Sequence, residues 1–360
     1  MEEKTQEIYD RLSSLDGVDI QRMDAEPEKM KRTGSGSYKL DEMLGGGWPE
    51  GRLCEVYGPP SGGKTTIALE AAKAAQEAGK IVGFVDAEHS LDPNYAFDGN
   101  KDIEGIGVDN GPWMISQPDS GESALHTVEK MVEEDVGFII VDSVAALTPE
   151  AELEGDIDDD HVGLQARLMS QHLRTMKGKA NAMDTTVIYL NQIRMKIGVM
   201  FGNPETTPGG KALKFYSSIR LRVSPSSHVK EGGDKVGQEI NARVTKNKTA
   251  PPFKSDTLNI RFGAGLDKAY ELAQYAQSMN AVQKAGAWIK IGDTTLCQGD
   301  SALRNLVLHN DPADPEADDV ESVPMKDRLE KRMRMISRGE LEPTERLELS
   351  DFDTSNDTDE

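Results

Sequence analysis

From residue 52 to residue 222, short apolar runs of strand length alternate with longer segments of helical character. The apolar runs cover residues 53–57, 81–85, 138–141 and 187–190, and the helical segments begin at Lys64 and cover 122–133 and 164–177. Continuous apolar runs are typical of strands buried on both faces, and their alternation with helices favours parallel pairing. This part of the chain is therefore predicted to be an α/β core, with a mainly parallel, twisted sheet and helices on both faces.

The segments that flank this core follow other patterns. An amphipathic helix is expected near residues 4–15, and a helix over 38–44 should end at three glycines, 45–47. Further strands are expected within 231–262, followed by a helix over 269–279 and a hairpin near 288–296. The predicted parts are an N-terminal helix and connector (1–32), the core (33–262), a small C-terminal α/β domain (263–310) and an acidic, partly helical and partly disordered tail (311–360).

Composition adds a charge asymmetry to this picture. The net charge is −22, which argues against a nucleic-acid partner, yet residues 167–222 carry ten lysines and arginines and only two acidic residues. A basic central block of this kind could hold a polyanion. The two cysteines lie far apart, no apolar run is long enough to cross a bilayer, and the chain does not start with a basic-then-apolar signal. These features predict a cytoplasmic protein with no membrane partner.

A glycine-rich segment joins the first strand of the core to its first helix. Its sequence, residues 58–65, fits Gly-x-x-x-x-Gly-Lys-[Ser/Thr]. In such a loop the glycines let backbone amides turn toward a β-phosphate, and the helix N-terminus favours the anion. Lys64 would reach the β- and γ-phosphates, and the Thr65 hydroxyl would ligate Mg²⁺. An ordinary turn with a solvated lysine fits this strand–loop–helix context less well, so ATP and Mg²⁺ are the predicted cofactors.

Two carboxylates follow other strands of the core. Asp142 lies at the carboxyl end of an apolar strand, the edge where open α/β sheets bind ligands, and is predicted to hold Mg²⁺, usually through water. Glu88 lies just past another strand and is the candidate for orienting and deprotonating the attacking water. Asp86 is expected to have a structural role, and His89 none. Together these features predict a P-loop ATPase without saying what hydrolysis is used for.

From about residue 33 to about residue 299, the chain resembles the bacterial RecA recombinases. The matching segments are Gly51-Arg52 with the phosphate loop, residues 85–93, 141–149, 190–206, 209–216 and 246–248, and Pro252-Phe253-Lys254. The block from Gln192 to Tyr216 is highly specific, because generic P-loop ATPases lack it. The resemblance fits a bacterial and a phage-encoded member of the family equally well.

The resemblance implies a RecA-like P-loop core and a DNA-dependent ATPase. Such a protein forms helical homo-oligomeric filaments on single-stranded DNA. It then pairs and exchanges homologous strands with double-stranded DNA, in recombination and repair. Single-strand-binding and mediator proteins are the further partners that it implies. The N-terminal segment (1–32) would serve subunit docking.

The resemblance also implies roles for single residues. Glu88 matches the catalytic glutamate, and Gln192 matches the sensor that couples the γ-phosphate to the DNA loop. Lys246 and Lys248 match lysines that reach the ATP of a neighbouring subunit, so hydrolysis would depend on filament assembly. With Lys64, these residues form the expected catalytic group. The nucleotide-binding set is expected to be Gly58, Pro59, Pro60, Ser61, Gly62, Gly63, Lys64, Thr65, Thr66, Asp92, Tyr95, Asp142 and Ser143. Within that set, Asp92 and Tyr95 would hold the adenine.

Two DNA-binding loops are implied, near residues 154–163 and near 194–210. The residues expected near the bound strand are Arg167, Arg194, Met195, Lys196, Ile197, Gly198, Val199, Met200, Gly209, Gly210 and Lys211. The composition of the second loop supports this independently, because basic ends and an apolar middle suit phosphate contacts and insertion between bases. The alternative is a mobile surface loop with an apolar patch for a protein partner.

Some segments depart from the family pattern. The phosphate loop has Pro60 and Gly62 where the family commonly has Glu and Ser, and the segment before Thr33 does not visibly match the family's polymerisation helix. The acidic tail is unusually long, and is expected either to mimic DNA and restrain DNA binding or only to solubilise the chain. A ring-forming helicase or translocase on the same core is the alternative function, which the Gln192–Tyr216 block disfavours. A non-enzymatic regulator that binds ATP and a protein partner is a third.

Overall fold

The fold is seen in a computed structural model, which describes residues 2–18, 20, 29–97, 104–108, 113–155, 163–195, 205–309, 323–343, 345 and 347. The chain divides into two compact units, residues 1–31 and 32–360. In the first unit, α1 (Glu2–Ser13) is the helix predicted near residues 4–15. In the described part of the chain, no helix combines the length and the apolar character needed to cross a bilayer.

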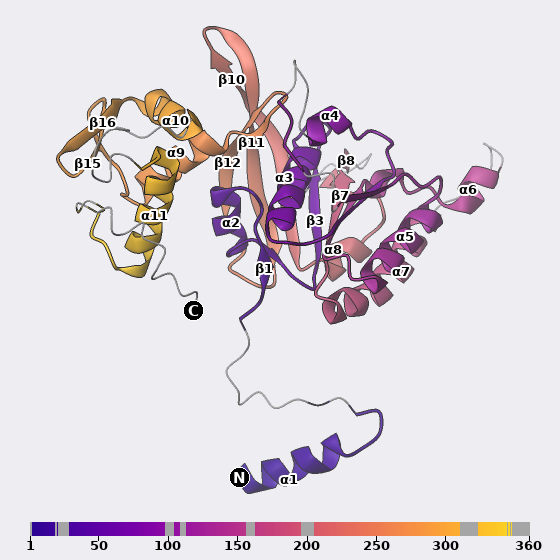
Figure 1. The fold of residues 1–360 in the computed structure, drawn as a ribbon. Helices are drawn as coiled ribbons and strands as arrows, with labels where there is room; N and C mark the ends of the chain where they lie inside the picture. The colour runs from indigo at the N-terminus through magenta and orange to yellow at the C-terminus, as the bar shows by residue number, and fades with distance from the viewer. Residues whose placement is uncertain are drawn as a thin grey trace. The chain divides into compact units, whose positions relative to one another are not determined.

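A large sheet organises the second unit (Figure 1). Its strands are β3 (Leu53–Gly58), β4 (Val82–Asp86), β5 (Trp113–Ser116), β6 (Phe138–Asp142), β7 (Thr186–Gln192), β10 (Ile219–Glu231), β11 (Asp234–Asn247), β12 (Ser255–Arg261) and β13 (Gly265–Leu266). They lie in the order β13-β12-β11-β10-β3-β7-β6-β4-β5. The pairs from β10 to β5 are parallel, and those from β10 to β13 are antiparallel. The predicted mainly parallel sheet is confirmed.

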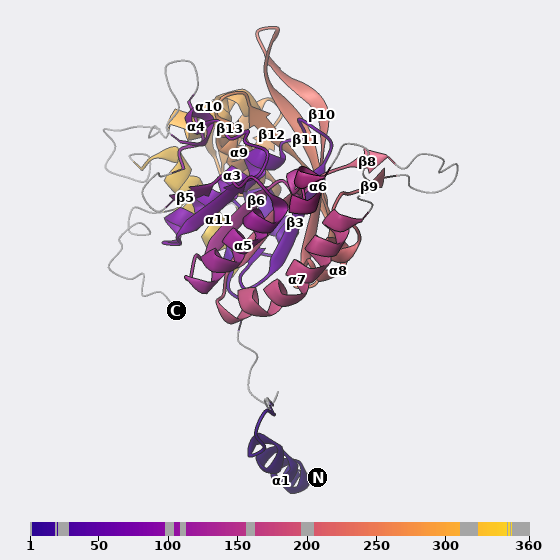
Figure 2. The same cartoon turned by 90° about the vertical axis from the view of Figure 1, so that its right-hand side faces the viewer.

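Helices cover both faces of this sheet, because its central strands are apolar on both sides. Phe138 and Ile140 of β6 belong to one core cluster, with residues of α2 (Tyr38–Leu44) and α3 (Lys64–Glu77). Ile139 and Val141 belong to a second cluster, with residues of α5 (Gly121–Glu133) and α7 (Leu164–Ala182). Successive strand residues thus point to opposite faces. Figure 2 shows α5 and α7 lying across one of these faces.

Shorter elements complete the core. They are β1 (Arg32–Thr33), β2 (Trp48–Pro49), α4 (Pro93–Ala96), a 3₁₀ turn (Val144–Ala146), α6 (Glu150–Glu154), β8 (Arg194–Met195), β9 (Glu205–Thr206) and α8 (Ala212–Tyr216). β1 pairs with β2, and β8 pairs with β9, both antiparallel. The predicted helix over 38–44 is α2, and it ends at Gly45, whose φ of 89° is the left-handed conformation that glycine adopts most readily.

A small C-terminal domain packs around a third apolar cluster. Its elements are α9 (Lys268–Ser278), β14 (Gln283–Ala285), β15 (Trp288–Ile291), β16 (Thr294–Gln298), α10 (Asp300–His309) and α11 (Met325–Arg338). Leu272, Ile289, Leu303 and Leu329 all belong to its core. Because Leu329 lies on α11, a helix from the segment predicted to be tail is part of this domain, and the boundary at residue 310 falls inside the domain.

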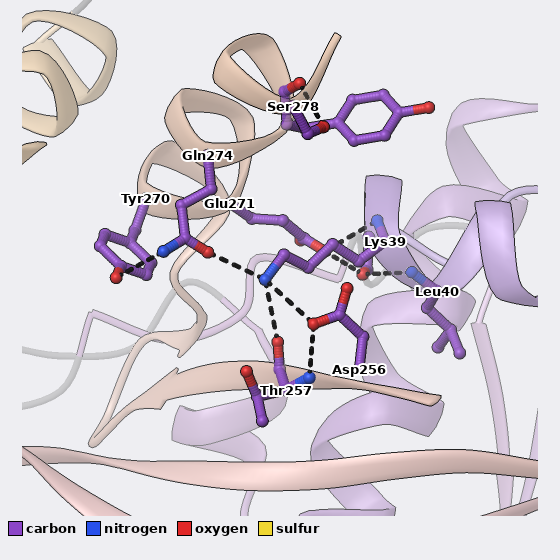
Figure 3. A network of polar contacts seen from close by, with 10 residues as sticks. Lys39, Leu40, Asp256, Thr257, Tyr270, Glu271, Gln274 and Ser278 are labelled. Atoms are coloured by element: carbon purple, nitrogen blue, oxygen red, sulfur yellow. Dashed lines mark hydrogen bonds and ion pairs between the residues drawn. The ribbon is translucent and has the colours of Figure 1, made fainter. Parts of the chain in front are cut away.

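A polar network attaches α9 to the large core (Figure 3). The Lys39 ammonium donates to the Gln274 side-chain oxygen at 2.9 Å and to the Thr257 carbonyl at 3.1 Å, and lies 3.4 Å from Asp256 Oδ1. The buried Glu271 carboxylate accepts from the Ser37 hydroxyl at 2.5 Å and from the Lys39 amide at 2.9 Å. Three elements, α2, β12 and α9, are thereby held together.

Candidate functional site

The glycine-rich loop connects β3 to α3 and needs glycine at two positions for steric reasons. A Cβ on Gly58 would lie 2.1 Å from the Val223 carbonyl oxygen, and one on Gly63 would lie 2.6 Å from Ile260 Cδ1. Gly63 also has a φ of 82°, in the left-handed region. The Lys64 ammonium donates to the Pro59 carbonyl at 2.9 Å. The loop therefore folds back over the Lys64 side chain. Its backbone amides and the N-terminus of α3 are the groups that an anion would contact.

Strand order brings the predicted chemical residues of four strands together. β3, β7, β6 and β4 are neighbours in parallel, so their carboxyl ends share one edge of the sheet. The Thr65 hydroxyl donates to Asp142 Oδ2 at 2.8 Å. Glu88 accepts a hydrogen bond from Gln192 Nε2 at 2.8 Å and another from the Ser143 hydroxyl. Five residues that are far apart in the sequence thus form one cluster: Thr65, Glu88, Asp142, Ser143 and Gln192.

Burial sets the electrostatics of this cluster. Burial raises the pKa of Asp142 to about 6; the Thr65 hydrogen bond opposes that shift, while Glu88 and Asp86 add to it. Burial also lowers the pKa of Lys64, an effect that Asp142 and Glu88 oppose. The negative charge of Asp142 is therefore only partly balanced by Lys64. A cation and a polyanion that bind together would neutralise both groups.

Asp86 has the structural role expected for it. It is fully buried, and its carboxylate accepts from the backbone amides of Ser90 and Leu91 at 3.1 and 3.2 Å and from the Gln117 amide at 3.0 Å. These bonds fix the turn that follows β4. That turn places Glu88 at the sheet edge, so Asp86 helps to position the exposed Glu88 carboxylate.

A cavity of about 360 Å³ opens beside the glycine-rich loop. Its lining residues are Ser61, Gly62, Gly63, Lys64, Thr65, Thr66, Tyr95, Gln238, Ile260, Arg261, Phe262 and Gly263. The Tyr95 and Thr66 hydroxyls are 2.8 Å apart, which holds the tyrosine ring at the cavity wall. Asp92 caps α4 by accepting from the Asn94 amide at 2.9 Å. It therefore lies at the start of the helix that carries Tyr95, without lining the cavity.

Five of the lining residues were not predicted from the sequence: Gln238, Ile260, Arg261, Phe262 and Gly263. They come from β11, from β12 and from the turn after β12, far along the chain from residues 58–65. No local motif marks them. The order of strands in the sheet, with β10 and β11 between β3 and β12, is what places them at the cavity.

Lys246 and Lys248 do not join this cluster. Lys246 pairs with Arg220 across the sheet, level with Glu55, and its ammonium donates to the carbonyls of Lys214 and Phe215 at 2.7 and 3.0 Å. Burial, followed by repulsion from Lys248, lowers the pKa of Lys246 to about 8. Both lysines lie by the α8 carbonyls and away from the glycine-rich loop of their own chain.

Parts of the second predicted DNA loop lie close to the first helix turn of α7. Gly209 donates its amide to Gln165 Oε1 at 3.1 Å, and the Asn191 side chain donates to the Pro208 carbonyl at 3.2 Å. A Cβ on Gly210 would lie 2.8 Å from Ala166 Cβ, one residue before Arg167. Residues 209 and 210 therefore pack tightly against α7, and Pro208 is bonded to β7.

The ends of that loop are basic and exposed. Arg194, Met195, Lys211 and Arg167 are all exposed, and β8 and β9 project from the sheet edge in Figure 2. Arg222 donates to Glu205 Oε1 at 2.8 Å, which ties β9 to β10. The predicted DNA-binding residues Lys196, Ile197, Gly198, Val199 and Met200 lie outside the described residues.

The chain is similar to known recombination proteins over most of its length. The family model described as RecA N-terminal domain matches residues 14–267. Protein RecA of Staphylococcus epidermidis is 47% identical over 297 residues, covering 82% of this chain and 83% of that protein. Protein RecA of Staphylococcus aureus is 44% identical over 330 residues, covering 90% of each.

Two further matches are a third RecA protein and a solved structure. Protein RecA of Streptococcus gordonii is 48% identical over 289 residues, covering 78% of this chain and 74% of that protein. The crystal structure of the RadB recombinase aligns with a TM-score of 0.49 and 22% identity, covering 65% of this chain and 98% of that one. By the extent of the family match and the identity to its curated members, the chain belongs to the RecA family of recombinases.

Proposed function

We propose that this chain is a DNA-dependent ATPase that forms filaments on single-stranded DNA and exchanges homologous strands in recombination and repair. Membership of the RecA family carries the activity class. The observation that carries the mechanism is the hydrogen bond of 2.8 Å between Gln192 Nε2 and Glu88 Oε1. It joins the carboxylate beside the glycine-rich loop to the strand that leads directly into the basic loop starting at Arg194.

The nucleotide would lie along the glycine-rich loop, with its base in the 360 Å³ cavity. Backbone amides of residues 61–65 and the start of α3 would receive the β-phosphate, and Lys64 would exchange its bond to Pro59 for the β- and γ-phosphates. The half-buried Tyr95 offers a ring face to the adenine. Asp92, which caps the helix that carries Tyr95, would help to set its position.

The residues at the sheet edge also fit Mg²⁺. The Thr65 hydroxyl and the Asp142 carboxylate are oxygen donors 2.8 Å apart, and oxygen ligands are the ones this ion prefers. Within the described residues no group of three or more His, Cys, Asp or Glu could hold a metal alone. We therefore infer that phosphate oxygens complete the site. When bound, the ion would neutralise charge that develops on the phosphates.

Glu88 would act on the attacking water. Its carboxylate is exposed at the sheet edge and already accepts hydrogen bonds from Gln192 and Ser143, so its orientation is fixed. A general base in such a position takes the proton as the water attacks the γ-phosphorus. The Gln192 amide that now donates to Glu88 could donate to a γ-phosphate oxygen instead. That exchange would report ATP to the loop that follows.

DNA would bind at the basic loop ends. Arg194, Lys211 and Arg167 are exposed cations near the tightly packed Gly209–Gly210 turn, and such groups position phosphates. We include residues 196–200 in this site on the resemblance alone. When ATP is bound, Gln192 would order the loop, and hydrolysis would release it.

Lys246 and Lys248 would complete the site of a neighbouring copy. They lie away from the glycine-rich loop of their own chain, so they could reach a γ-phosphate only across a subunit contact. A lysine whose pKa is already lowered to about 8 gains from a phosphate partner, because the new negative charge favours its charged form. Hydrolysis would then depend on filament assembly. The N-terminal segment 1–32 is the part that we assign to subunit docking.

Two finer assignments follow from the resemblance and the composition. We expect single-strand-binding and mediator proteins among the partners of the filament. Cys54 and Cys297 are free thiols, which fits the cytoplasm as the place of this activity.

The test is ATP hydrolysis with and without single-stranded DNA, for the wild type and Glu88→Gln. The wild type should be strongly stimulated by DNA. Glu88→Gln should lower kcat roughly 10²- to 10⁴-fold, because glutamine cannot take the proton, while DNA binding with bound ATP persists. Glu134→Gln, at an exposed position that ends α5, is the matched control and should leave the rate unchanged. Wild-type activity that is indifferent to DNA would contradict the proposed function.

A further inference from the structure

Arg261 lies at the wall of the nucleotide cavity and has carboxylates on two sides. It is the last residue of β12 and one of the cavity-lining residues. Its guanidinium donates to Glu231 Oε1 at 2.7 Å and Oε2 at 3.1 Å, and lies 3.5 Å from Asp267 Oδ2. Two parallel bonds to one carboxylate fix the plane of an arginine, so its side chain is oriented as well as neutralised.

Glu231 comes from the tip of the long β10–β11 hairpin. It is the last residue of β10, and Gly232 and Gly233 follow it with φ of 58° and 100°. In Figure 1 this hairpin extends past the other strands of the sheet. The Glu231 side chain is 52% exposed, whereas that of Arg261 is only 24% exposed. Arg261 is thus the inner partner of a contact that reaches from the cavity to the hairpin tip.

Asp267 continues the contact toward the C-terminal domain. Its carboxylate, 5% exposed, accepts from Arg304 Nε at 2.8 and 3.0 Å, and caps α9 by accepting from the Tyr270 amide at 3.1 Å. Arg304 lies on α10. Glu231, Arg261, Asp267 and Arg304 therefore form a chain of alternating charges, which we call the Arg261 charge chain. It runs from the hairpin tip, past the cavity, to the C-terminal domain.

Two further hydrogen bonds, one from a side chain and one from the backbone, join the same hairpin to the cavity. Gln238 Nε2, on β11, donates to the Ser61 carbonyl of the glycine-rich loop at 3.2 Å. The Phe262 amide, in the turn that lines the cavity, donates to the Val236 carbonyl at 3.0 Å. A shift of the cavity wall when a nucleotide enters would therefore act on the hairpin at more than one point.

We propose that Arg261 is a positioning residue that couples nucleotide occupancy of the cavity to the β10–β11 hairpin through Glu231. The inference rests on the proposed function, because it takes ATP as the occupant. The wall formed by residues 260–263 contacts the nucleotide, and Arg261 passes its position to the hairpin. By linkage, the factor by which the docked hairpin improves ATP affinity equals the factor by which ATP stabilises the docked hairpin.

In this proposal, bound ATP favours the state in which Arg261 pairs with both Glu231 and Asp267. Because the Glu231 end is exposed, added salt should weaken the coupling, and the Asp267 end should resist salt. The pair between Arg261 and Glu231 is the exposed one and therefore limits the size of the coupling. A partly exposed ion pair corresponds to roughly a two- to fivefold change in the affinity for ATP.

The first measurement is the ATP concentration dependence of DNA-stimulated hydrolysis. Arg261→Met keeps the aliphatic stem and removes the charge, and should raise KM for ATP roughly two- to fivefold with kcat little changed. Glu231→Gln, at the exposed tip, should shift KM in the same direction by less. Arg261→Lys keeps the charge but loses the paired geometry, and should fall between wild type and Arg261→Met. Lys284→Met breaks an exposed ion pair with Asp300 and is the matched control.

The second measurement is hydrogen exchange of residues 226–238, with and without Mg²⁺ and a non-hydrolysable ATP analogue. In the wild type and Lys284→Met, the nucleotide should slow exchange at the hairpin tip. In Arg261→Met and Glu231→Gln, that difference should be lost, although the protein stays folded. A purely structural ion pair would change exchange equally with and without nucleotide.

The outcomes separate the inference from the function on which it rests. If Arg261→Met keeps the wild-type KM and the wild-type nucleotide protection of the hairpin, the coupling is wrong while the ATPase stands. If wild-type hairpin exchange does not respond to the nucleotide, the coupling is also wrong. If the wild type shows no DNA-stimulated hydrolysis, the proposed function itself fails.

Discussion

His172 shows how one buried residue changes the pH response of this fold. It lies on α7 with its side chain 4% exposed, and Nε2 is 2.8 Å from the Tyr189 hydroxyl of β7. Burial, with Lys179 adding to it, lowers the pKa of His172 to about 4. Glu129 of α5, 3.9 Å from Nδ1, is the carboxylate that faces the ring. The imidazole is therefore neutral at pH 7, between two helices and a strand.

We predict that His172 makes the protein lose stability as pH falls from about 6.5 to about 4. In that window the unfolded chain binds a proton that the folded chain does not, so the free energy of unfolding decreases as the pH decreases. The full contribution is about 3 kcal/mol as an order of magnitude. His172→Gln, which keeps a hydrogen-bonding partner for Tyr189 and does not titrate here, should flatten this slope.

Denaturant unfolding at several pH values measures this slope. His126→Gln, at an exposed histidine on α5, is the control, because it makes the same substitution outside the core. An unchanged slope in His172→Gln would mean that the folded chain protonates His172 as readily as the unfolded one does.

At the scale of elements, the contact between α2 and α9 decides how the C-terminal domain is attached. Ser37 has two functions there: its hydroxyl oxygen accepts from the Leu40 amide at 3.0 Å, which caps α2, and its hydroxyl donates to Glu271. Burial raises the pKa of Glu271, and the Ser37 and Lys39 hydrogen bonds oppose that shift. Figure 3 shows how Lys39 extends the contact to β12 and to Gln274.

Ser37→Ala should therefore destabilise the protein by more than the loss of a helix cap alone. Loss of an N-cap costs about 1 kcal/mol, and leaving a buried carboxylate short of a donor adds roughly 1–3 kcal/mol. Ser120→Ala is the matched control, because Ser120 caps α5 by accepting from the Ser123 amide at 3.1 Å and donates to the exposed Glu150 carboxylate at 3.0 Å. Thermal unfolding of both variants gives the comparison. Equal losses of stability in the two variants would mean that the hydrogen bond from Ser37 to Glu271 does not stabilise the protein.

At the scale of the whole molecule, charge is divided between parts of the sequence. The net charge is −22, and residues 348–360 alone carry six carboxylates. The cations that we assign to DNA lie on α7 and at the ends of the 194–210 loop. A polyanionic segment in the same molecule competes with DNA for such cations, and salt or Mg²⁺ screens that competition.

Deletion of residues 348–360 should tighten binding to single-stranded DNA at low Mg²⁺ and make it less dependent on Mg²⁺. The physical reason is the removal of six like charges that compete with the phosphates. Titration of fluorescent single-stranded DNA at several Mg²⁺ concentrations measures the effect. A variant with Gln and Asn at the six acidic positions keeps the length and separates charge from chain length. Identical binding by all three proteins would favour a tail that only solubilises the chain.

Much of the fold could be predicted because its signals are local. Apolar runs such as 138–141 are buried on both faces, so their pattern alone indicates strands of a covered sheet, and the fold class is confirmed. Residues 58–65 combine steric need and phosphate chemistry within eight positions, which makes the loop readable from the sequence. Asp142 and Glu88 could be selected because each follows an apolar strand.

Only the tertiary structure decided which of these ends meet. Gln192 and Glu88 are 104 residues apart, and they touch because β7, β6 and β4 are neighbours. The same strand order brings Arg261 to the cavity and leaves Lys246 away from it, although both lie in strands beyond β10. The packing of α11 into the C-terminal domain likewise depends on an apolar surface formed by other elements. Periodicity in the sequence fixes which face of an element is apolar, whereas the order of strands depends on long-range hydrogen bonding and packing that no local pattern carries.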